Sequence, residues 1–529
     1  MKKNHQNISL FLGAIFTLGI SACTKDFQKY NTDPNKLSAS QSVSIAGTAF
    51  GPMEQAIYSN YQRAQNLSAD GYSGYMQPGI AFGGDHNNLT YAMNDGWNST
   101  GFNDEYTQVM APVHALATTT TIKTANPEMW AVALLIQVEA MDRVTDRFGP
   151  IPYTKVATSL TSAPYDSQQT VYNTFFKQID TAVANLKAYI GANPGKTSLG
   201  ASDYVYAGNY TEWLKFANSL RLRLAMRLSK VDPATAKTQA QAALSDSGGL
   251  LTTAADDAAI AQGGGRENDL HMISGDWNNT NMSAAIGSYL IGYHDPRLAV
   301  YFQPAQAAAG AYAGQYQGIR AGSIIGSNQS TYSNFANLNT NQTFQFTTPQ
   351  LIMTAAEVWF LRAEAALRGW SSENIQTDYE TGITTSMSQW GVATGSYLTD
   401  ATSTEANFTD PLNASNNINA LSNITIKWDN SATQEQKLER IITQKWLAIF
   451  PDGQEAWADY RRTGYPKLFS VANNFSGGSI DTQVQVRRLP YPASEYTNNN
   501  AAVTQAVTLL GGPDNGGTRL WWDINKPNF

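Results

Sequence analysis

The sequence predicts a mainly α-helical protein that carries a large, irregular face built from loops. Apolar residues recur with the helical period in several long segments, whereas the alternation typical of strands is weak and scattered. The stretches between these segments are rich in Asn, Thr, Ser and Gly and also in aromatic residues. Because no Pro/Gly/Ser-rich linker interrupts residues 42–529, we expect a single domain there.

Helical segments recur from about residue 42 onward. The segment 129–149 (MWAVALLIQVEAMDRVTDRFG) follows Asn126-Pro127 and stops at Gly149-Pro150, as expected for a helix with a start and a stop signal. Four more helices are predicted at 211–230, 348–370, 433–450 and 454–462. Small and large residues alternate in AAEVWFLRAEAALRGW, which indicates paired helices of the tetratricopeptide kind, although no clean 34-residue period runs through the chain.

The remaining segments are predicted to form long loops. They lie at about 70–110, 262–345 and 465–529. The best short strand candidate, VQVRRLPYP at 484–492, falls within the last of them.

The N-terminus has the features of an export signal. Two lysines precede an apolar run of about 15 residues, which is shorter than the roughly 20 residues that cross a bilayer. Ile20-Ser21-Ala22 precedes Cys23, the single cysteine of the chain, and resembles the lipobox of bacterial lipoproteins. We therefore expect a lipoprotein signal peptide at 1–22, lipidation of Cys23 and a flexible tether at 23–41. The alternative is an ordinary signal peptide beside an incidental cysteine.

Composition and motifs exclude several classes of function. A formal net charge of −7 without a basic run argues against binding to nucleic acid. The histidines are dispersed, and DPNK and DHNN fall short of a calcium loop, so we expect no cofactor and no metal site, while a Ca²⁺ ion bound among the Asn/Asp loops stays open as the alternative. The chain also lacks the common motifs of nucleophilic, metal-dependent and phosphate-binding enzymes.

Charged residues of both signs alternate on several helices. Asp142 and Asp146 alternate with Arg143 and Arg147 in MDRVTDRFG, and a similar mixture occurs at 455–462. Such patterns normally form structural ion pairs, and we interpret them in this way. The competing interpretation is a surface glycoside hydrolase, which would need two carboxylates about 5–10 Å apart in a cleft.

The aromatic residues in the loops indicate a binding surface. Flat rings beside amide and carboxylate groups suit sugars, because ring C–H groups stack on a π-face and hydroxyls find short polar partners. The alternative for any single residue is that its ring anchors the loop to the core. The candidate ligand-binding residues are Trp97, Tyr91, Phe102, Trp277, Tyr316 and Arg320.

Several motifs together resemble the SusD/RagB family of Bacteroidetes outer-membrane lipoproteins, in particular its SusD-like branch. They are CTKDFQKYNTDPNKLS, DRVTDRFGPIPYTKV, HDPRLAVYF, TAAEVWFLRAEAALRGW, ERIITQKWLAIFPDGQEAWADYRRTGYPKL, RRLPYPASEYTNNNAAV and TRLWWD. The resemblance implies a scaffold of four tetratricopeptide-like hairpins that supports a loop-rich face. It also implies that Trp97, in GWNSTGFNDEY, lies where relatives often carry an aromatic residue that stacks on glycans.

The resemblance further implies a function without catalysis. A lipid-anchored protein of the outer membrane, facing the cell exterior, would bind oligosaccharide or another nutrient and deliver it to a SusC-like TonB-dependent transporter. The residues after Cys23 match only in part the acidic signals for surface export. Two other functions stay open, a lid that binds peptides and a purely structural partner of the transporter.

Overall fold

Helices make up most of the regular structure in the computed structural model, which describes residues 46–156, 162–262 and 266–529. The mainly α-helical fold class predicted from the sequence is therefore confirmed. All elements described below belong to one compact unit, Gly47–Phe529.

The N-terminal predictions are not tested by the structure. The signal peptide at 1–22, the lipidation site Cys23 and the tether at 23–41 all lie outside the described residues. Among the residues that are described, no helix is both long enough and apolar enough to cross a membrane.

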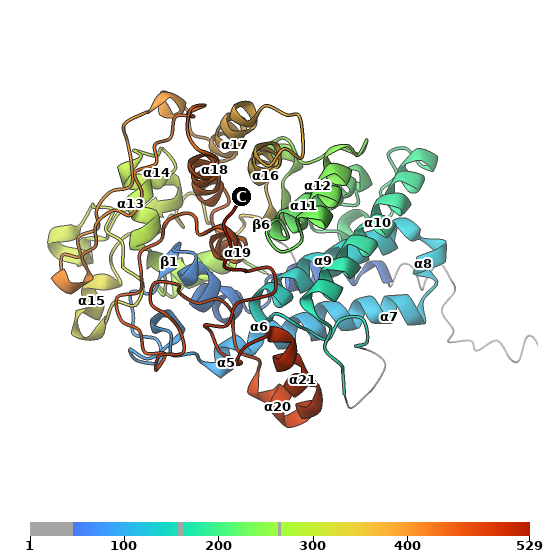
Figure 1. Cartoon of the computed structure of the whole chain (residues 1–529), viewed down its shortest axis with the longest axis horizontal. Helices are drawn as coiled ribbons and strands as arrows, with labels where there is room; N and C mark the ends of the chain where they lie inside the picture. Colours follow the sequence, from blue (N-terminus) through green and yellow to red (C-terminus); the bar gives the residue numbers. More distant parts are fainter. Residues whose placement is uncertain (1–45, 157–161, 263–265) are drawn as a thin grey trace, which may run out of the picture. The chain divides into compact units, whose positions relative to one another are not determined.

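Pairs of neighbouring helices form the scaffold. Its helices are α9 (Pro127–Phe148), α10 (Gln168–Ala192), α11 (Tyr210–Arg227), α12 (Pro233–Leu244), α16 (Ala355–Leu367), α17 (Ile375–Gln389), α18 (Gln434–Ala448) and α19 (Gly453–Thr463). α9 packs on α10, α11 on α12 and α16 on α17, while α18 lies against both α16 and α17. Figure 1 shows α9–α12 together at one end, with α16–α19 beside them. This arrangement agrees with the helical pairs predicted from the sequence.

Local signals fix the ends of these helices. Pro127 occupies the first turn of α9, where its missing N–H costs nothing, and Gly149 follows the last residue with a φ of +89°. The Thr433 side chain accepts a hydrogen bond from the Gln436 backbone N–H, and the Gln436 side chain accepts one in return from Thr433, so α18 begins with a capping box. α19 ends at Gly464, which adopts the left-handed conformation.

The remaining elements are short. The short α-helices are α4 (Phe50–Ala56), α5 (Asp95–Asn98), α6 (Thr100–Glu105), α7 (Ala111–Thr119), α8 (Ile122–Ala125), α13 (Ala284–Gly292), α14 (Leu298–Tyr301), α15 (Gln329–Tyr332), α20 (Ala493–Asn498) and α21 (Asn500–Leu510). The strands are β1 (Met76–Gln77), β2 (Ala258–Ile260), β3 (Asn281–Met282), β4 (Phe302–Gln303), β5 (Asn337–Leu338) and β6 (Gln350–Met353). β1, β3, β5 and β4 form an antiparallel sheet in that order, and β2 pairs with β6.

The structure differs from the predicted helix at 348–370, from the predicted strand at 484–492 and from all three predicted loops, of which 70–110 contains α5 and α6 and 262–345 contains α13–α15. The helix predicted at 348–370 begins only at α16, because the apolar run of β6 pairs with β2 instead. Residues 484–492 form no strand, since the backbone N–H of Leu489 donates to the Arg147 carbonyl and not to a ladder partner. The loop predicted at 465–529 contains α20 and α21, where a run of Ala, Val and Leu ends at Gly511.

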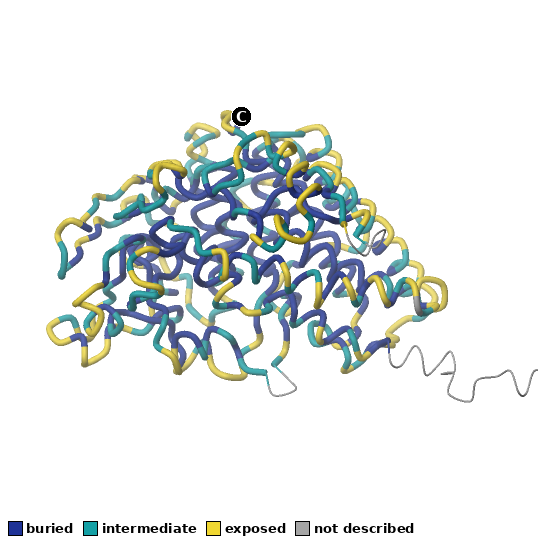
Figure 2. The backbone as a smooth tube through the Cα atoms, turned by 90° about the horizontal axis from the view of Figure 1, so that it is seen from below, coloured by how far each residue is buried: buried dark blue, intermediate teal, exposed yellow. Residues whose placement is uncertain are grey.

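Aromatic residues hold the sheet region against the scaffold. The indole N–H of Trp446 donates to the Ser73 carbonyl at 2.8 Å, and the Trp446 ring stacks on Tyr75 with centroids 5.4 Å apart. Phe450 stacks in turn on Tyr301 at 4.6 Å. Figure 2 shows that buried residues fill the interior of the helical part, whereas exposed residues gather along the loops.

Buried charges join the scaffold helices to one another. Arg223 of α11 pairs with Glu139 of α9 at 3.2 Å and with Glu357 of α16 at 2.6 Å. Lys445 of α18 reaches Glu455 and Asp459 of α19 at 2.9 and 2.7 Å. The ion-pair core, as we call this network, consists of Glu139, Arg143, Asp146, Arg223, Arg227, Glu357, Glu364, Lys445, Asp452, Glu455, Asp459 and Arg462, all less than 9% exposed.

The ion-pair core confirms the structural interpretation of the mixed charges on the helices. A cavity lined by Glu139, Asp142, Asp146 and Glu455 holds only about 10 Å³, which leaves no room for a substrate. Arginines of α9 and α11 line the same cavity and pair with Glu139, Asp146 and Glu455, while Asp142 accepts a hydrogen bond from Tyr172. A pair of carboxylates poised across an open cleft for glycoside hydrolysis is therefore absent from this part of the described structure.

Candidate ligand-binding sites

Three loop segments that are far apart in the sequence meet on one surface. The backbone N–H of Phe475 donates to the Thr90 carbonyl at 2.7 Å, and that of Ala472 donates to the Ala321 carbonyl at 2.8 Å. We call this surface the loop face and define it as residues 79–97, 315–322 and 470–482. Its connections are main-chain hydrogen bonds outside any regular sheet, so side chains must fix its shape.

Trp97 lies on the loop face with its side chain partly exposed. It belongs to α5, whose N-cap residue Asn94 accepts a hydrogen bond from the Trp97 backbone N–H at 3.2 Å. The indole meets Phe82 edge to face, with ring centroids 6.3 Å apart. The cap and the neighbouring ring thus hold a partly exposed aromatic platform in place.

Amide side chains shape the loop that precedes Trp97. Asn87 donates from Nδ2 to the carbonyls of Phe82 and Gly84 at 2.9 and 3.0 Å. The imidazole of His86 stacks on Phe475 with ring centroids 4.1 Å apart and planes within 2°. The loop is therefore braced from within and from the facing segment, which prepares its shape for a ligand.

Tyr91 and Phe102 pack into the core. Tyr91 is 5% exposed and Phe102 is 3% exposed. Phe102 meets Phe148 of α9 edge to face at 5.1 Å, and Tyr91 contacts Tyr72 at 6.5 Å. In this structure both rings anchor their segments, which is the alternative role that the sequence left open for loop aromatics.

Arg320 ties two loops together. It is 8% exposed, and its guanidinium donates to the carbonyls of Ser470, Asn416 and Asn417 at 3.0–3.3 Å. Partial burial lowers its pKa. These bonds give Arg320 the role of positioning the loop face, while Tyr316 in the same loop keeps a partly exposed ring.

Trp277 is the most exposed of the candidates, at 48%. It lines a cavity of about 450 Å³ together with Arg63, Arg266 and Asp269. None of the residues lining this cavity belongs to the loop face. The structure thus brings Trp97, Tyr316 and Arg320 into the loop face and leaves Trp277 at a different hollow.

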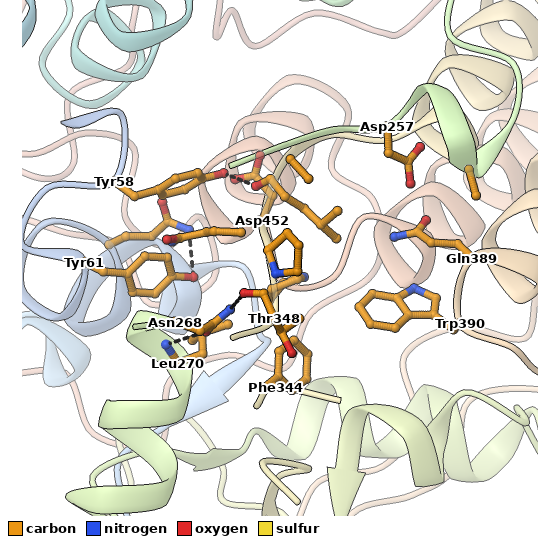
Figure 3. Close-up of a pocket in the computed structure, with 17 residues that line it drawn as sticks. Tyr58, Tyr61, Asp257, Asn268, Leu270, Phe344, Thr348, Gln389, Trp390 and Asp452 are labelled. Atoms are coloured by element: carbon orange, nitrogen blue, oxygen red, sulfur yellow. Dashed lines mark hydrogen bonds between the residues drawn. The ribbon is translucent and has the colours of Figure 1, made fainter. Parts of the chain in front are cut away.

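A further pocket, which sequence analysis missed, holds about 260 Å³ between the scaffold and β6. Figure 3 shows Asp257, Gln389 and Trp390 on one side of it, and Tyr58 and Tyr61 on the other. The Oε1 of Gln389 and the indole N–H of Trp390 are buried without hydrogen-bond partners. Small neutral molecules or ordered waters would satisfy them.

Burial raises the pKa of Asp257 in this pocket to about 7. The hydrogen bond that it accepts from the Ala355 backbone N–H lowers the pKa, but by less than burial raises it. The only sequence signal for the pocket was an amide and an aromatic residue directly before Gly391 at the end of α17. Among the described residues, no group of three or more His, Cys, Asp or Glu side chains is arranged to hold a metal ion.

Comparison with known proteins places the whole chain in one group. The sequence profile of the SusD-like family, described as Susd and RagB outer membrane lipoprotein, matches residues 26–523. A search of curated protein sequences found no match.

Several solved structures are similar over nearly their full length. A chitin-binding SusD homologue from Flavobacterium johnsoniae is 42% identical, with a TM-score of 0.87 over 92% of this chain and 100% of that one. A SusD homologue from Bacteroides vulgatus is 37% identical, with a TM-score of 0.85 over 92% and 99% of the two chains. A SusD-like protein from Bacteroides thetaiotaomicron is 36% identical, with a TM-score of 0.84 over 90% and 98%.

Proposed function

Because this chain belongs to the SusD-like family of outer membrane lipoproteins, we propose that it captures oligosaccharides on the loop face and delivers them to a SusC-like TonB-dependent transporter. The observation that carries the proposal is Trp97, a partly exposed indole held by a helix cap and by Phe82 on a braced loop. Lipidation of Cys23 would anchor the protein to the outer membrane with the loop face accessible from outside the cell.

Chitin-type oligosaccharides are the first ligands to expect. The similar structure from Flavobacterium johnsoniae is that of a chitin-binding protein, and 42% identity extends over 92% of this chain. An N-acetylglucosamine unit has an apolar ring face for Trp97 and amide and hydroxyl groups for the Asn-rich loop around Asn94. We expect modest affinity, because an open and hydrated site gains little net free energy per contact.

The proposed role is binding without catalysis. Of the carboxylates that sequence analysis considered for glycoside hydrolysis, Asp146 is buried in an ion pair with Arg227 and Asp142 is buried against the Tyr172 hydroxyl, around a cavity of about 10 Å³. What the site contributes is an oriented aromatic surface beside fixed polar groups, which binds and aligns a sugar chain.

Calorimetric titration with chitin oligosaccharides, and with a panel of plant, algal and host glycans, tests the proposal. The full chain is extracted in nonionic detergent, and Trp97→Ala, Trp277→Ala and the exposed-aromatic control Phe346→Ala are titrated alongside. We expect Trp97→Ala to weaken binding of one glycan class by about fivefold or more, which takes a weak site towards the limit of detection, since stacking on one aromatic side chain contributes about 1 kcal/mol or more.

Other outcomes would identify the rival functions. Loss of binding only in Trp277→Ala would move the site to the hollow around Arg266. Release of shorter products would indicate a hydrolase. If the folded protein binds none of the glycans measurably, the proposal is refuted, and peptide capture or a purely structural partnership with the transporter is favoured.

A further inference from the structure

A cavity of about 500 Å³ near the C-terminal segment collects positive charge. We call it the basic cavity. Its charged lining residues in the described structure are Lys230, Arg461, Arg462, Lys467, Arg487, Arg519 and Lys526, with one carboxylate, Glu435. This concentration is unusual in a chain whose formal net charge is −7.

Some of these cations are neutralised from behind. Arg462 forms ion pairs with Glu364 at 2.6 Å and with Asp459 at 2.8 Å. Arg487 and Arg519 share a single carboxylate, Asp523, which is fully buried. Arg462 therefore brings little uncompensated charge to the cavity wall, whereas Arg487 and Arg519 together keep one positive charge more than their shared carboxylate offsets.

Within the part of the chain that the structure describes, the other cations in the wall form no ion pair with a carboxylate. Lys230 donates from Nζ only to the Arg462 carbonyl, at 3.1 Å. Lys526 is exposed at the rim, and Lys467 lies over the Tyr465 ring at 4.5 Å. The single lining carboxylate, Glu435, already accepts hydrogen bonds from Tyr465 and Asn528. The wall thus holds more positive than negative charge.

Arg461 is a further cation of the wall without a paired carboxylate in the described structure. It is 2% exposed and lies over the Trp457 ring at 3.6 Å, and its Nη1 donates to the carbonyls of Asp146 and Arg487. Its Nη2 has no hydrogen-bond partner among the described residues. The buried guanidinium therefore adds positive charge behind the cavity surface.

The titration of two groups agrees with this picture. Burial, reinforced by the neighbouring Arg462, lowers the pKa of Lys230 to about 8. Burial also lowers the pKa of Arg461 to about 9, although Asp146 opposes the shift. Both charged forms would be stabilised by an anion in the cavity.

We propose that the basic cavity binds a sulfate or phosphate group. A tetrahedral oxyanion presents several acceptors to the cations of the wall, among them Lys230 and Lys526, and its negative charge offsets part of their excess positive charge. The group can arrive as the free ion or as an ester on a sugar. The proposal does not depend on glycan binding at the loop face, because none of the residues that line the basic cavity belongs to the loop face.

The first test compares sodium sulfate, sodium phosphate and sodium chloride at equal ionic strength on the full chain in nonionic detergent. Calorimetry and thermal melting should show saturable binding for the two oxyanions and none for chloride. Equal effects of the three salts would mean general screening and would overturn the proposal.

The second test removes the uncompensated charges. The double variant Lys230→Gln, Lys526→Gln should bind sulfate at least about tenfold more weakly, since it loses two cations that can form charge-assisted contacts with the anion. The control Lys177→Gln changes an exposed lysine on α10 and should bind like the parent. If the double variant has a lower melting temperature than the parent in sodium chloride, the single variant Lys526→Gln is used instead, because Lys526 is exposed and its replacement should leave the fold intact. Parental affinity in the deciding variant would refute the site.

Chemical labelling tests anion binding on the unmodified sequence, so its result does not depend on whether a variant folds. With its pKa near 8, Lys230 should react with an amine acylating reagent at pH 8, and sulfate should protect it, as measured by peptide mass spectrometry. Absence of protection at saturating sulfate would contradict the proposal.

A third comparison shows whether the bound group arrives as a free ion or as a sugar ester. The affinity for N-acetylglucosamine 6-sulfate is measured beside that for the unsulfated sugar and for free sulfate. Tighter binding than sulfate identifies a sugar ester, and equal binding identifies the free ion.

Discussion

In the ion-pair core, charged side chains from α9, α11, α16, α18 and α19 are paired and shielded from water, whereas on the loop face neutral amides and aromatic rings carry the contacts. Arg227 illustrates the first region, with Asp146 at 2.9 Å and Glu455 also paired to it. Asn87 illustrates the second, with two hydrogen bonds to loop carbonyls. A buried ion pair ties distant helices into one geometry, while the amide-braced loops leave ring faces free for a ligand.

The largest effect should come from breaking the ion-pair core. Arg227→Met leaves Asp146 and Glu455 without their main countercharge, and removing one partner of a buried pair costs about 3–5 kcal/mol. We expect a large drop in the melting temperature and in the urea midpoint. The exposed control Lys177→Met should stay within about 0.5 kcal/mol of the parent. A small effect of Arg227→Met would mean that the network is less coupled than its geometry indicates.

An intermediate effect should come from releasing the tie between loops. Arg320→Met removes the donors to the carbonyls of Ser470, Asn416 and Asn417, at a cost of about 2–3 kcal/mol. We expect the loop face to open separately from the scaffold, so hydrogen exchange should rise in 315–322 and 470–476 and stay unchanged in α9. Equal acceleration in α9 would show that the two regions unfold together.

A pH-dependent effect should arise from Asp257 in the pocket of Figure 3. Its pKa of about 7 in the folded protein lies above the ordinary value near 3.9, so its contribution to stability is complete below about pH 4 and is lost as the pH rises through 7. Asp257→Asn should therefore match the parent below about pH 4 and gain stability over it as the pH rises to 7, by at most about 1.4 kcal/mol for each unit by which the pKa is raised. Parallel curves of melting temperature against pH for the two proteins would contradict the raised pKa.

The smallest effect on stability should follow Phe475→Ala. It removes the stack on His86, which is worth about 0.5–1.5 kcal/mol, and leaves the backbone bond from residue 475 to Thr90 available. Hydrogen exchange should rise only in 82–90, and the affinity for glycan should fall because the Trp97 loop loses its brace. Unchanged affinity would restrict the ligand site to Trp97 itself and its α5 neighbours.

The scaffold could be predicted from the sequence because its signals are local. Asn126-Pro127 and Gly149 mark the ends of α9, and Thr433 with Gln436 marks the start of α18. The apolar run QLIM at 350–353 has no such marker, and only its pairing with β2 made it a strand. The helical period therefore succeeds where caps accompany it and fails where a distant strand competes.

The candidate site could be predicted only in part. Trp97 was found through an aromatic, Asn-rich context, and the structure gives it a partly exposed position. The same context did not separate Trp97 from Tyr91, which lies within a few residues of it and is buried. Arg320 resembled a ligand donor in the sequence, but its acceptors are carbonyls about 100 and 150 residues away.

By itself, the sequence determined the helical class, the helix ends and, through its motifs, the SusD-like family, because periodicity, caps and motifs are properties of short segments. Tertiary structure alone decided which charges lie in the ion-pair core, which rings face solvent and which lysines meet in the basic cavity. The physical reason is that burial and electrostatic pairing depend on residues from distant segments. Arg461 and Arg462 are neighbours in the chain, yet one pairs with Glu364 and the other keeps an N–H without an acceptor.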